Sequence, residues 1–552
     1  MEFGSSNFPI FTKNDDLDDV RRSVKFHPTI WGEYFLAYAS TEISSVEKDE
    51  LQKQKKMMRK VLNQTPDDSS HKLELIDAIQ RLGVSYHFEE EIGKSLKCIY
   101  DIYSECSNKD NNVRSVALRF RLLRQQGYAI SPDVFSKFTD KEGNFNEMMF
   151  ENVEDLLDLY EAAHFGVDGD EILDKALEFS SSKLQFLLPI MTTSLSKQVK
   201  EALKIPILKS LTRLGAWKFI AAYQQHKSHN EILLNFAKLD FNIVQKMHQK
   251  ELSLITRWWK DLNFTNKLSF ARDRVAECYF WILGVYFEPQ YQFERRILTK
   301  VLALISIMDD IYDIYGTLED LQLFTRIVQR WDVNDLDQLP PYMGICYKAF
   351  LDVYLEMEAE VENGGESYLV QYTKEEMKKL TRAFLQEAEW VYSKYMPTME
   401  EYTEVALVTT GHAMMATLSL IGVRNTVTKK DLEWITSKPL IVQASAIVCR
   451  FMDDIVGFGI EKKYTAVHCY MNQNGASKMD TFAQLREQVK KAWKDMNQEC
   501  LEPTPVSMSI LKPVVDLARV IHLLYADNDD YTNSQTNTRD YISCVLVEPL
   551  TT

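Results

Sequence analysis

Two aspartates in the second half of the chain have the side-chain type and spacing of a metal site. Asp309 and Asp313 occur in the segment SIMDDIYDIYG, so on a helix both carboxylates project from one face. Like charges at this spacing repel each other, so a cation is expected between them. Carboxylate oxygens suit Mg²⁺, which keeps several waters and completes its shell with substrate phosphates. A solvated acidic turn is the alternative, but the apolar run at residues 301–308 places the pair at the end of a buried helix.

A second acidic segment, CRFMDDIVGFGIE, predicts the other half of the same site. Asp453, Gly457 and Glu461 follow one another at intervals of four, which predicts one face of one helix, and Arg450 lies a turn earlier. Two acidic helices that face each other across a bundle form a site for several divalent ions. Such ions in an acidic protein imply a polyanionic ligand, for which a diphosphate is the natural candidate. Neither a dinucleotide-binding glycine fingerprint nor a P-loop occurs in the sequence.

Basic and aromatic side chains suited to such a ligand occur in two further segments. In FARDRVAECYFW, Arg272 and Arg274 flank an aspartate, and Trp281 follows on the same helical face as Arg274. Arginine forks match phosphate oxygens, and an aromatic face stabilises a cation. The second segment, YADNDDYT near the C-terminus, contributes Tyr525, Asp529 and Tyr531. Taken alone, the two arginines are more typical of surface ion pairs, and YADNDDYT is typical of a polar loop.

The elements that position these residues are predicted to be helices. The chain has 552 residues, of which 45% are hydrophobic and 26% charged, so it can fill large cores and is not disordered. Its 19 glycines and 15 prolines are about half the usual share, which disfavours all-β folds because these need many turns. Helical spacing of apolar residues recurs, for example at Phe236, Leu239, Ile243 and Met247. We therefore expect an all-α protein.

A polar stretch divides the chain. QQHKSHN, at residues 224–230, has helical patterns on both sides and is the best candidate for a domain boundary. We expect a flexible tail at residues 1–20, an N-terminal domain at residues 21–225 and a C-terminal domain at residues 226–552. A length prior of roughly 150 residues per domain is compatible with this division into two.

The net charge of −16 limits the partners and the location of the protein. An acidic surface repels nucleic acid and anionic lipid, so neither is an expected partner. Eight cysteines without CxxC spacing are typical of reduced thiols in a cytosol-like compartment. The N-terminal residues have neither the apolar core of a signal peptide nor the composition of a transit peptide, so we expect a cytoplasmic location.

One apolar segment is long enough to suggest a membrane span. The nineteen uncharged residues between Glu404 and Arg424 include a histidine, three threonines, a serine and two glycines, without a flanking aromatic belt. We expect a helix buried inside a helical protein instead of a membrane span. Thr409, Thr410 and Gly411 predict a break or kink that faces a cavity.

Together these motifs resemble the class I plant terpene synthases. The DDxxD at residues 309–313, the RDR at 272–274 and the RxxDD at 450–454 are typical of that family, as are the segments FEPQY and LPPYM. The tandem Arg21 and Arg22 with Trp31 is similar to the family's N-terminal strap. The resemblance covers nearly the whole chain. It implies a catalytically silent N-terminal α-barrel domain and a C-terminal α-helical bundle of the class I terpenoid synthase type, which holds the active site.

The length and the missing transit peptide most resemble the cytosolic sesquiterpene branch of this family, whose substrate is farnesyl diphosphate. The resemblance implies a monomeric enzyme that ionises this substrate with Mg²⁺, cyclises or rearranges the carbocation and releases diphosphate. It implies three Mg²⁺ ions, for which Mn²⁺ is a possible substitute. Their expected ligands are Asp309, Asp313, Asp453 and Glu461, with Gly457 at the remaining ligand position.

The resemblance assigns the other candidates to the two halves of the substrate. The residues expected at the diphosphate are Arg272, Arg274, Arg450 and Lys462, or Lys463 in its place. Those expected around the carbocation are Trp281, Tyr525, Asp529, Tyr531 and, on the kinked helix, Thr409, Thr410 and Gly411. The aromatic faces would stabilise the positive charge, and a closed pocket would keep water away until the reaction ends.

Two features depart from the family pattern. Gly457 stands where the family usually has serine or threonine, so a water would replace one metal ligand. The stretch after Glu461 is shorter than usual. A DxDD sequence at residues 16–19 matches the protonating motif of class II cyclases, but it lies in a polar tail and is not expected to act as one.

Three alternatives stay open at this point. A monoterpene synthase acting on geranyl diphosphate is the first, since tandem arginines are common in the straps of such enzymes. An isoprenyl diphosphate synthase is the second, although it would need a second DDxxD motif. The third is a non-catalytic helical scaffold, which only Gly457 and the short loop support.

Overall fold

The computed structural model describes residues 26–105, 112–150, 152–226, 229–362, 367–423, 426–460 and 463–551. Helices form nearly all the regular structure of these residues. The β-type pairing within them is a single isolated bridge between Thr139 and Phe145. The prediction of an all-α fold is confirmed.

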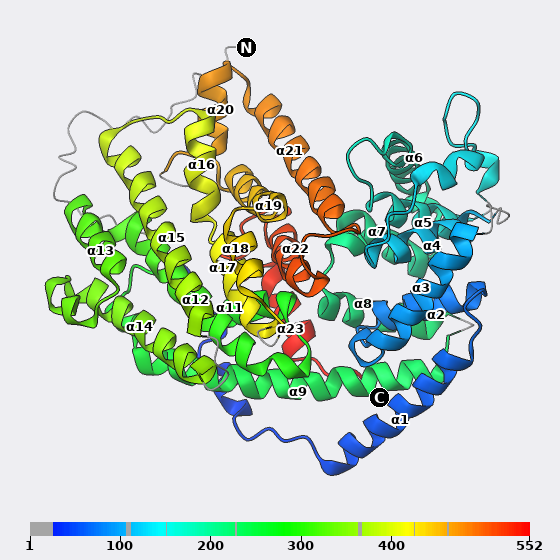
Figure 1. Cartoon of the computed structure of the whole chain (residues 1–552), viewed down its shortest axis with the longest axis horizontal. Helices are drawn as coiled ribbons and strands as arrows, with labels where there is room; N and C mark the ends of the chain where they lie inside the picture. The colour runs from blue at the N-terminus through cyan, green and yellow to red at the C-terminus, as the bar shows by residue number, and fades with distance from the viewer. Residues whose placement is uncertain are drawn as a thin grey trace.

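The helices of the first part of the chain gather at one end of the molecule, coloured blue to teal in Figure 1. They are α1 (Ser45–Gln64), α2 (Ser70–Arg81), α3 (Glu89–Glu105), α4 (Val113–Gln125), α5 (Val153–Ala163), α6 (Glu171–Leu187), α7 (Thr193–Lys204) and α8 (Thr212–Gln225). Helix α4 packs on α2 and α5, and α5 packs on α6. A short 3₁₀ turn, η6 (Ile207–Lys209), precedes α8 and contacts the second part of the chain at α22.

The second part of the chain forms a larger bundle, coloured green to red in Figure 1. Its helices are α9 (Glu231–Leu262), α10 (Phe264–Lys267), α11 (Val275–Val285), α12 (Gln292–Asp310), α13 (Leu318–Arg330), α14 (Pro341–Glu362), α15 (Ser367–Ser393), α16 (Met399–Thr409), α17 (His412–Ser419), α18 (Lys429–Thr436), α19 (Leu440–Gly457), α20 (Ala466–Asn474), α21 (Lys478–Glu499), α22 (Met508–Leu524) and α23 (Asn537–Leu546). Helix α19 packs on α21 and α22, α11 packs on α12 and α22, and α15 packs on α13, α16 and α17.

Helix α9 joins the two parts and runs beneath most of their helices in Figure 1, with α1 below it. Its N-terminus is capped by Asn230, whose side chain accepts a hydrogen bond from the main-chain N–H of Leu233, and it ends at Asn263 in a left-handed conformation. It packs on α1 and the 3₁₀ turn η1 (Tyr34–Tyr38) on one side and on α11, α12 and α23 on the other. The boundary predicted at residue 225 falls between α8 and α9. The exact domain limits stay a prediction, and residues 1–20 lie outside the described part of the chain.

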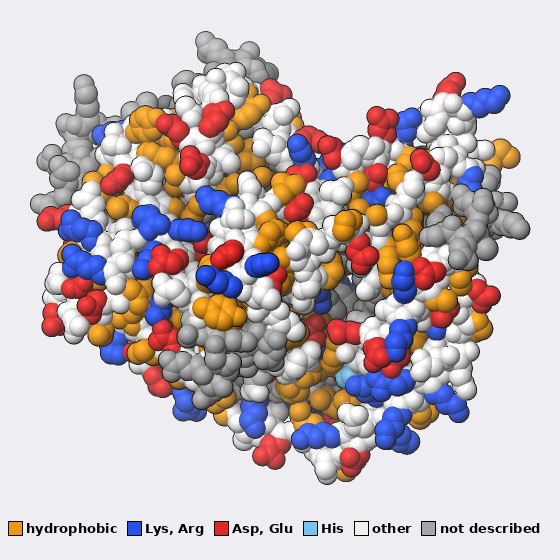
Figure 2. All heavy atoms as spheres, in the orientation of Figure 1, with side chains coloured by type: hydrophobic (Ala, Val, Ile, Leu, Met, Phe, Trp, Pro, Cys, Tyr) orange, Lys and Arg blue, Asp and Glu red, His pale blue; other side chains and the backbone are white. Residues whose placement is uncertain are grey.

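The core is continuous through both parts. One cluster of buried apolar side chains extends from Trp31, near the start of the described chain, to Leu546 in α23. All seven cysteines within the described residues have free thiols. At the surface, Figure 2 shows acidic and basic side chains interspersed over one face, as expected for a chain with 80 acidic and 64 basic residues.

The apolar segment that resembled a membrane span is a broken helix of the core. Helix α16 ends at Thr409, and α17 begins at His412 after Gly411, whose φ of +71° favours glycine. By length and composition Met399–Val423 could cross a membrane, and among the described residues it alone passes that test. In the protein, 67% of its most apolar window is buried. The predicted break at Thr409, Thr410 and Gly411 is present.

Candidate active site

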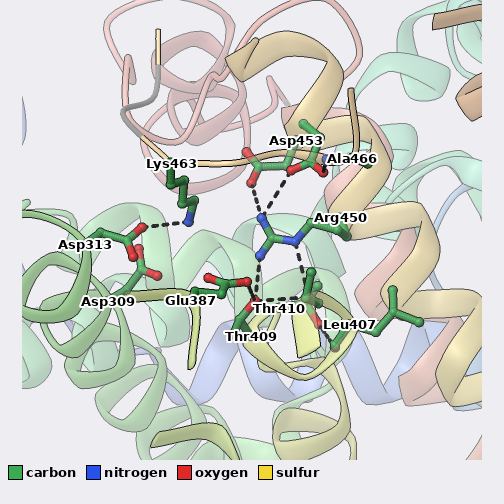
Figure 3. Close-up of polar contacts among 12 residues, drawn as sticks. Asp309, Asp313, Glu387, Leu407, Thr409, Thr410, Arg450, Asp453, Lys463 and Ala466 are labelled. Carbon is green, nitrogen blue, oxygen red and sulfur yellow. Dashed lines mark hydrogen bonds and ion pairs between the residues drawn. The ribbon is translucent and has the colours of Figure 1, made fainter. Parts of the chain in front are cut away.

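The first acidic motif lies where α12 changes its geometry. Asp309 is in the last turn of α12, and Asp313 is in the π-helical turn η8 (Ile311–Tyr315) that continues it. The main-chain N–H of Gly316 donates to the carbonyl of Ile311 over 2.8 Å, a spacing of five residues that defines the π turn. The predicted helix therefore changes from α to π geometry between the two aspartates. Both carboxylates nevertheless lie on the same side of the site in Figure 3.

Each of these aspartates is paired with a basic side chain. Arg272 donates from Nη2 to Oδ2 of Asp309 over 2.6 Å, and Lys463 donates from Nζ to Oδ2 of Asp313 over 2.6 Å. Burial raises the pKa of Asp313, although Lys463 opposes this effect. Burial would also raise the pKa of Asp309, but the charges of Lys463 and Arg272 outweigh it and hold this pKa below its ordinary value. The two basic side chains therefore stabilise the ionised form of Asp309.

The second acidic motif lies on α19, across the site from the first (Figure 3). Arg450 donates from Nη1 to Asp453 over 3.2 Å and to Asp454 over 3.4 Å. Helix α19 ends at Gly457, so the prediction that one helix carries the whole motif is wrong beyond that residue. The chain leaves the helix because Gly459 follows with a φ of +84°, which a helix does not allow. Glu461 and Lys462 themselves lie outside the described residues.

The broken helix supplies main-chain and hydroxyl groups to this side of the site. Arg450 donates from Nε to the carbonyl of Ala406 over 3.2 Å and from Nη2 to the hydroxyl of Thr409 over 3.2 Å. Ala406 lies in the last turn of α16, where carbonyls lose their helical partners. The hydroxyl of Thr410 donates to the carbonyl of the preceding turn, and Gly411 then reverses the backbone. The break therefore fixes Arg450 from below while Asp453 fixes it from above (Figure 3).

A further acidic residue, not identified from the sequence, joins the two halves of the site. Glu387 of α15 accepts a hydrogen bond from the hydroxyl of Thr409 through Oε1 over 2.7 Å. Its other oxygen, Oε2, is buried without a hydrogen-bond partner. Glu387 lines a cavity of about 20 Å³ together with Asp313 and Lys463. The surrounding sequence, QEAEW, contains no DDxxD-like spacing, so the residues near Glu387 in the chain do not indicate its role.

Three aromatic residues predicted at the carbocation are buried in the bundle. The rings of Trp281 on α11 and Tyr531 after α22 meet edge to face with centroids 5.6 Å apart. The hydroxyl of Tyr531 donates to Ser306 over 2.8 Å. Tyr525 directly follows the last residue of α22 and is also buried. Asp529 accepts hydrogen bonds from the main-chain N–H groups of Tyr531 (3.1 Å) and Thr532 (2.8 Å), so it shapes the loop that carries Tyr531.

The two arginines of the RDR motif have different surroundings. Arg272 reaches the first acidic motif, as described above, and its guanidinium also lies 5.5 Å from the ring of Tyr531. Arg274 is 2% exposed and donates to the main-chain carbonyls of His27, Asp273, Tyr531 and Thr532. The structure therefore gives Arg274 a set of main-chain partners that the sequence did not predict. Its predicted contact with diphosphate stays a prediction.

The donor set of this site fits Mg²⁺. It offers carboxylate oxygens on two facing elements and the unpartnered buried Oε2 of Glu387, which are hard ligands of the kind that Mg²⁺ prefers. Arg272 and Lys463 occupy positions next to Asp309 and Asp313 where positive charge is stabilised. Within the described residues, no three acidic, histidine or cysteine side chains come close enough together to hold an ion by themselves. That arrangement suits a metal that takes its remaining ligands from water and a phosphorylated substrate.

Comparisons with known proteins identify the family. The model of the terpene synthase N-terminal domain matches residues 30–203, and that of the metal-binding domain of the terpene synthase family matches residues 260–495. The (-)-germacrene D synthase of Origanum vulgare is 55% identical over 100% of this chain and 98% of its own length. The chain belongs to the terpene synthase family. The beta-caryophyllene synthase of Lavandula angustifolia, another such terpene synthase, is 56% identical over 98% of this chain and 99% of its own length.

Solved terpene synthase structures have the same fold. Limonene synthase with 2-fluorolinalyl diphosphate has a TM-score of 0.90 and 30% identity, covering 96% of this chain and 100% of the other. Isoprene synthase from grey poplar, in complex with three Mg²⁺ ions and dimethylallyl-S-thiolodiphosphate, has a TM-score of 0.86 and 32% identity, covering 95% of this chain and 99% of the other. The predicted family, two-domain helical fold and enzyme class are confirmed. The roles predicted for individual site residues stay predictions.

Proposed function

We propose that this terpene synthase is a sesquiterpene synthase, which ionises farnesyl diphosphate, cyclises or rearranges the resulting carbocation and releases diphosphate. The observation that carries the proposal is the pair of acidic elements facing each other, with Asp309 and Asp313 on one side and Asp453 on the other (Figure 3). The full-length similarity to germacrene D and beta-caryophyllene synthases supports a sesquiterpene product. We further propose that the protein acts as a monomer in the cytoplasm.

The metal ligands in this proposal are Asp309, Asp313, Asp453 and Glu461, with three Mg²⁺ ions in the complete site and Mn²⁺ as a substitute. Mg²⁺ held by these residues would supply positive charge that neutralises the diphosphate and eases loss of the allylic C–O bond. Glu387 contributes its unpartnered Oε2 to the side of the site that holds Asp313. Gly457 provides no side-chain oxygen, so a water completes the shell on the α19 side.

Basic side chains retain the diphosphate. Arg272 and Lys463 each donate a hydrogen bond to an acidic side chain, and the same N–H groups could donate to phosphate oxygens of a bound substrate. Arg450 is held between Asp453 and the carbonyl of Ala406, so its guanidinium faces the diphosphate from the side opposite Arg272 and Lys463. Positive charge on both sides stabilises the departing anion in a site shielded from water. We propose the same contact for Lys462.

Aromatic side chains stabilise the carbocation in this proposal. Trp281, Tyr525 and Tyr531 offer aromatic faces that stabilise positive charge without a nucleophilic group. Ser306 and Trp281 fix the ring of Tyr531, so its face is held in position before the reaction begins. The main-chain carbonyls at Thr409, Thr410 and Gly411 are the proposed polar contacts of the cation.

The test is incubation of the purified protein with Mg²⁺ and each of three substrates, followed by gas chromatography with mass spectrometry. The substrates are farnesyl diphosphate, geranyl diphosphate, and farnesyl diphosphate with isopentenyl diphosphate. We expect a C15 hydrocarbon or alcohol from farnesyl diphosphate alone and slower or no turnover of geranyl diphosphate. Turnover only with isopentenyl diphosphate would indicate an elongating transferase, preference for geranyl diphosphate would indicate a monoterpene synthase, and no product from any mixture would indicate a scaffold.

A further inference from the structure

The two acidic motifs share an arrangement that the metal assignment does not explain. Each contains adjacent aspartates, and in each pair the first side chain faces the site while the second is buried. The side chain of Asp309 is 26% exposed against 1% for Asp310, and that of Asp453 is 21% exposed against 0% for Asp454. Adjacent helical residues point in directions about 100° apart, so the two members of a pair meet different surroundings.

The buried member of the first pair is bonded to the RDR segment. Asp310 accepts a hydrogen bond from the main-chain N–H of Arg272 over 2.7 Å, and its Oδ1 lies 3.0 Å from Nε of the same residue. The carboxylate thereby fixes both the backbone and the side chain of Arg272. From that position, Nη2 of Arg272 reaches Asp309 over 2.6 Å.

The buried member of the second pair is bonded to the segment that follows α19. Asp454 accepts a hydrogen bond from the main-chain N–H of Ala466 over 2.7 Å and from the hydroxyl of Tyr402 over 2.7 Å. Ala466 is the first residue of α20, where a main-chain N–H has no partner within the helix and a carboxylate is favourable. Lys463 lies three residues earlier and reaches Asp313 over 2.6 Å.

We propose that Asp310 and Asp454 are positioning residues that hold the two segments bearing the diphosphate-binding cations. Asp310 places Arg272, Asp454 places Lys463, and neither carboxylate is a metal ligand. Both motifs follow the same arrangement: the outer aspartates bind the metals, and the inner aspartates position the basic side chains. This inference rests on the proposed function of the site.

The inner aspartates are poorly placed to bind metal. The oxygens of Asp454 already accept from Tyr402, Ala466 and Arg450, and those of Asp310 accept two bonds from Arg272. Turning either carboxylate toward the site would take away the partner of a main-chain N–H, which is buried at Ala466 and partly buried at Arg272. The outer aspartates, by contrast, accept hydrogen bonds from side chains, Asp309 from Arg272 and Asp453 from Arg450.

The experiment compares asparagine and leucine at the inner positions with asparagine at the outer ones. Asparagine keeps an oxygen that can accept from the main-chain N–H, whereas leucine removes it. Binding of inorganic diphosphate in excess Mg²⁺ is measured by titration calorimetry, and the Mg²⁺ concentration for half-maximal rate is measured separately. Asp310→Leu and Asp454→Leu should weaken diphosphate binding by about tenfold or more, by analogy with the loss seen when residues that orient metal ligands are replaced. Asp310→Asn and Asp454→Asn should bind diphosphate nearly as the unaltered protein does, with an unchanged Mg²⁺ requirement.

The outer positions provide the matched control. Asp309→Asn and Asp453→Asn should raise the Mg²⁺ requirement, because they remove a ligand charge. Thermal melting checks the fold of every variant. If Asp454→Leu does not fold, Ala466→Pro deletes the N–H donor at a first helical position, where proline is accepted, and Lys429→Pro at the start of α18 is its exposed counterpart.

Two results would overturn the inference. One is an Mg²⁺ requirement in Asp310→Asn or Asp454→Asn raised as far as in the outer variants. The other is diphosphate affinity left unchanged by the folded leucine or proline variants. Calorimetry with inorganic diphosphate needs no turnover, so these results are distinct from a failure of the proposed function, in which the unaltered protein itself would not bind diphosphate.

Discussion

Replacing Arg274 with alanine should open the pocket to water, because this side chain joins three separate parts of the chain. Its guanidinium donates to the carbonyls of Tyr531 (3.3 Å), Thr532 (2.7 Å) and His27 (2.9 Å). His27 belongs to the segment that precedes Trp31, while Tyr531 and Thr532 lie in the loop after α22. The arginine thus ties the N-terminal segment to the loop that carries Tyr531, one of the aromatic residues proposed to surround the carbocation.

The size of the effect follows from the three bonds. A hydrogen bond from a charged donor contributes about 1.5–3 kcal/mol. The bond to Tyr531 is long, and His27 is exposed, so its carbonyl regains water when released. The bond to Thr532 should therefore dominate, and we expect the free energy of unfolding to fall by about 2–4 kcal/mol. Since natural domains are stable by about 5–15 kcal/mol, the variant should remain folded.

The assay combines product analysis with hydrogen exchange. Arg274→Ala should raise the share of hydroxylated or acyclic products from farnesyl diphosphate and speed exchange at residues 26–33 and 529–536. Arg274→Lys keeps the charge but lacks the planar fork, so it should behave more like alanine than like arginine. If the products and the exchange of both variants matched those of the unaltered protein while only KM rose, Arg274 would be a diphosphate ligand and the structural tie would be refuted.

Three further predictions concern other parts of the molecule. Gly457→Ser should lower the Mg²⁺ concentration for half-maximal rate by restoring a hydroxyl ligand, and an unchanged or higher requirement would show that no ligand is missing. Burial raises the pKa of Glu161 from 4.5 to about 7. As the pH rises between these values, Glu161 loses its proton in the unfolded chain but keeps it in the folded protein, so the free energy of unfolding falls. In Glu161→Gln this pH-dependent decrease of about 3 kcal/mol in the free energy of unfolding should be absent, as measured by denaturant unfolding at several pH values. The same pH dependence in the variant and the unaltered protein would contradict the raised pKa of Glu161. Arg21→Ala/Arg22→Ala should increase water-quenched products at nearly the same melting temperature, since exposed ion pairs contribute only about 0–1 kcal/mol, and an identical product profile would exclude a capping role.

The helices and the acidic side chains that they present to the site could be predicted from the sequence, because both depend on the spacing of residues that are close in the chain. The separation of Asp309 and Asp313 predicts two carboxylates on one side of a helix end, and a π turn preserves that result. Thr409, Thr410 and Gly411 predict the break between α16 and α17 because glycine allows the left-handed conformation found there. In both cases the residues that determine the geometry are within a few positions of one another.

The remaining features depend on contacts between distant segments. Glu387 lies 74 residues after Asp313, and only the packing of α15 beside η8 brings them to one cavity. The partners of Arg274 include His27 and Thr532, which no periodicity relates to it. The end of α19 at Gly457 was missed because the four-residue intervals continue in the sequence, although Gly459 stops the helix.

The most direct test of the central claim is the Mg²⁺-dependent turnover of farnesyl diphosphate by Asp309→Asn and Asp313→Asn. Both changes preserve side-chain shape and remove a ligand charge, so melting temperatures should stay close to that of the unaltered protein. We predict that turnover collapses in both variants and that added Mg²⁺ restores only part of it. Wild-type rates at ordinary Mg²⁺ concentrations in both folded variants would show that these aspartates do not hold the metal.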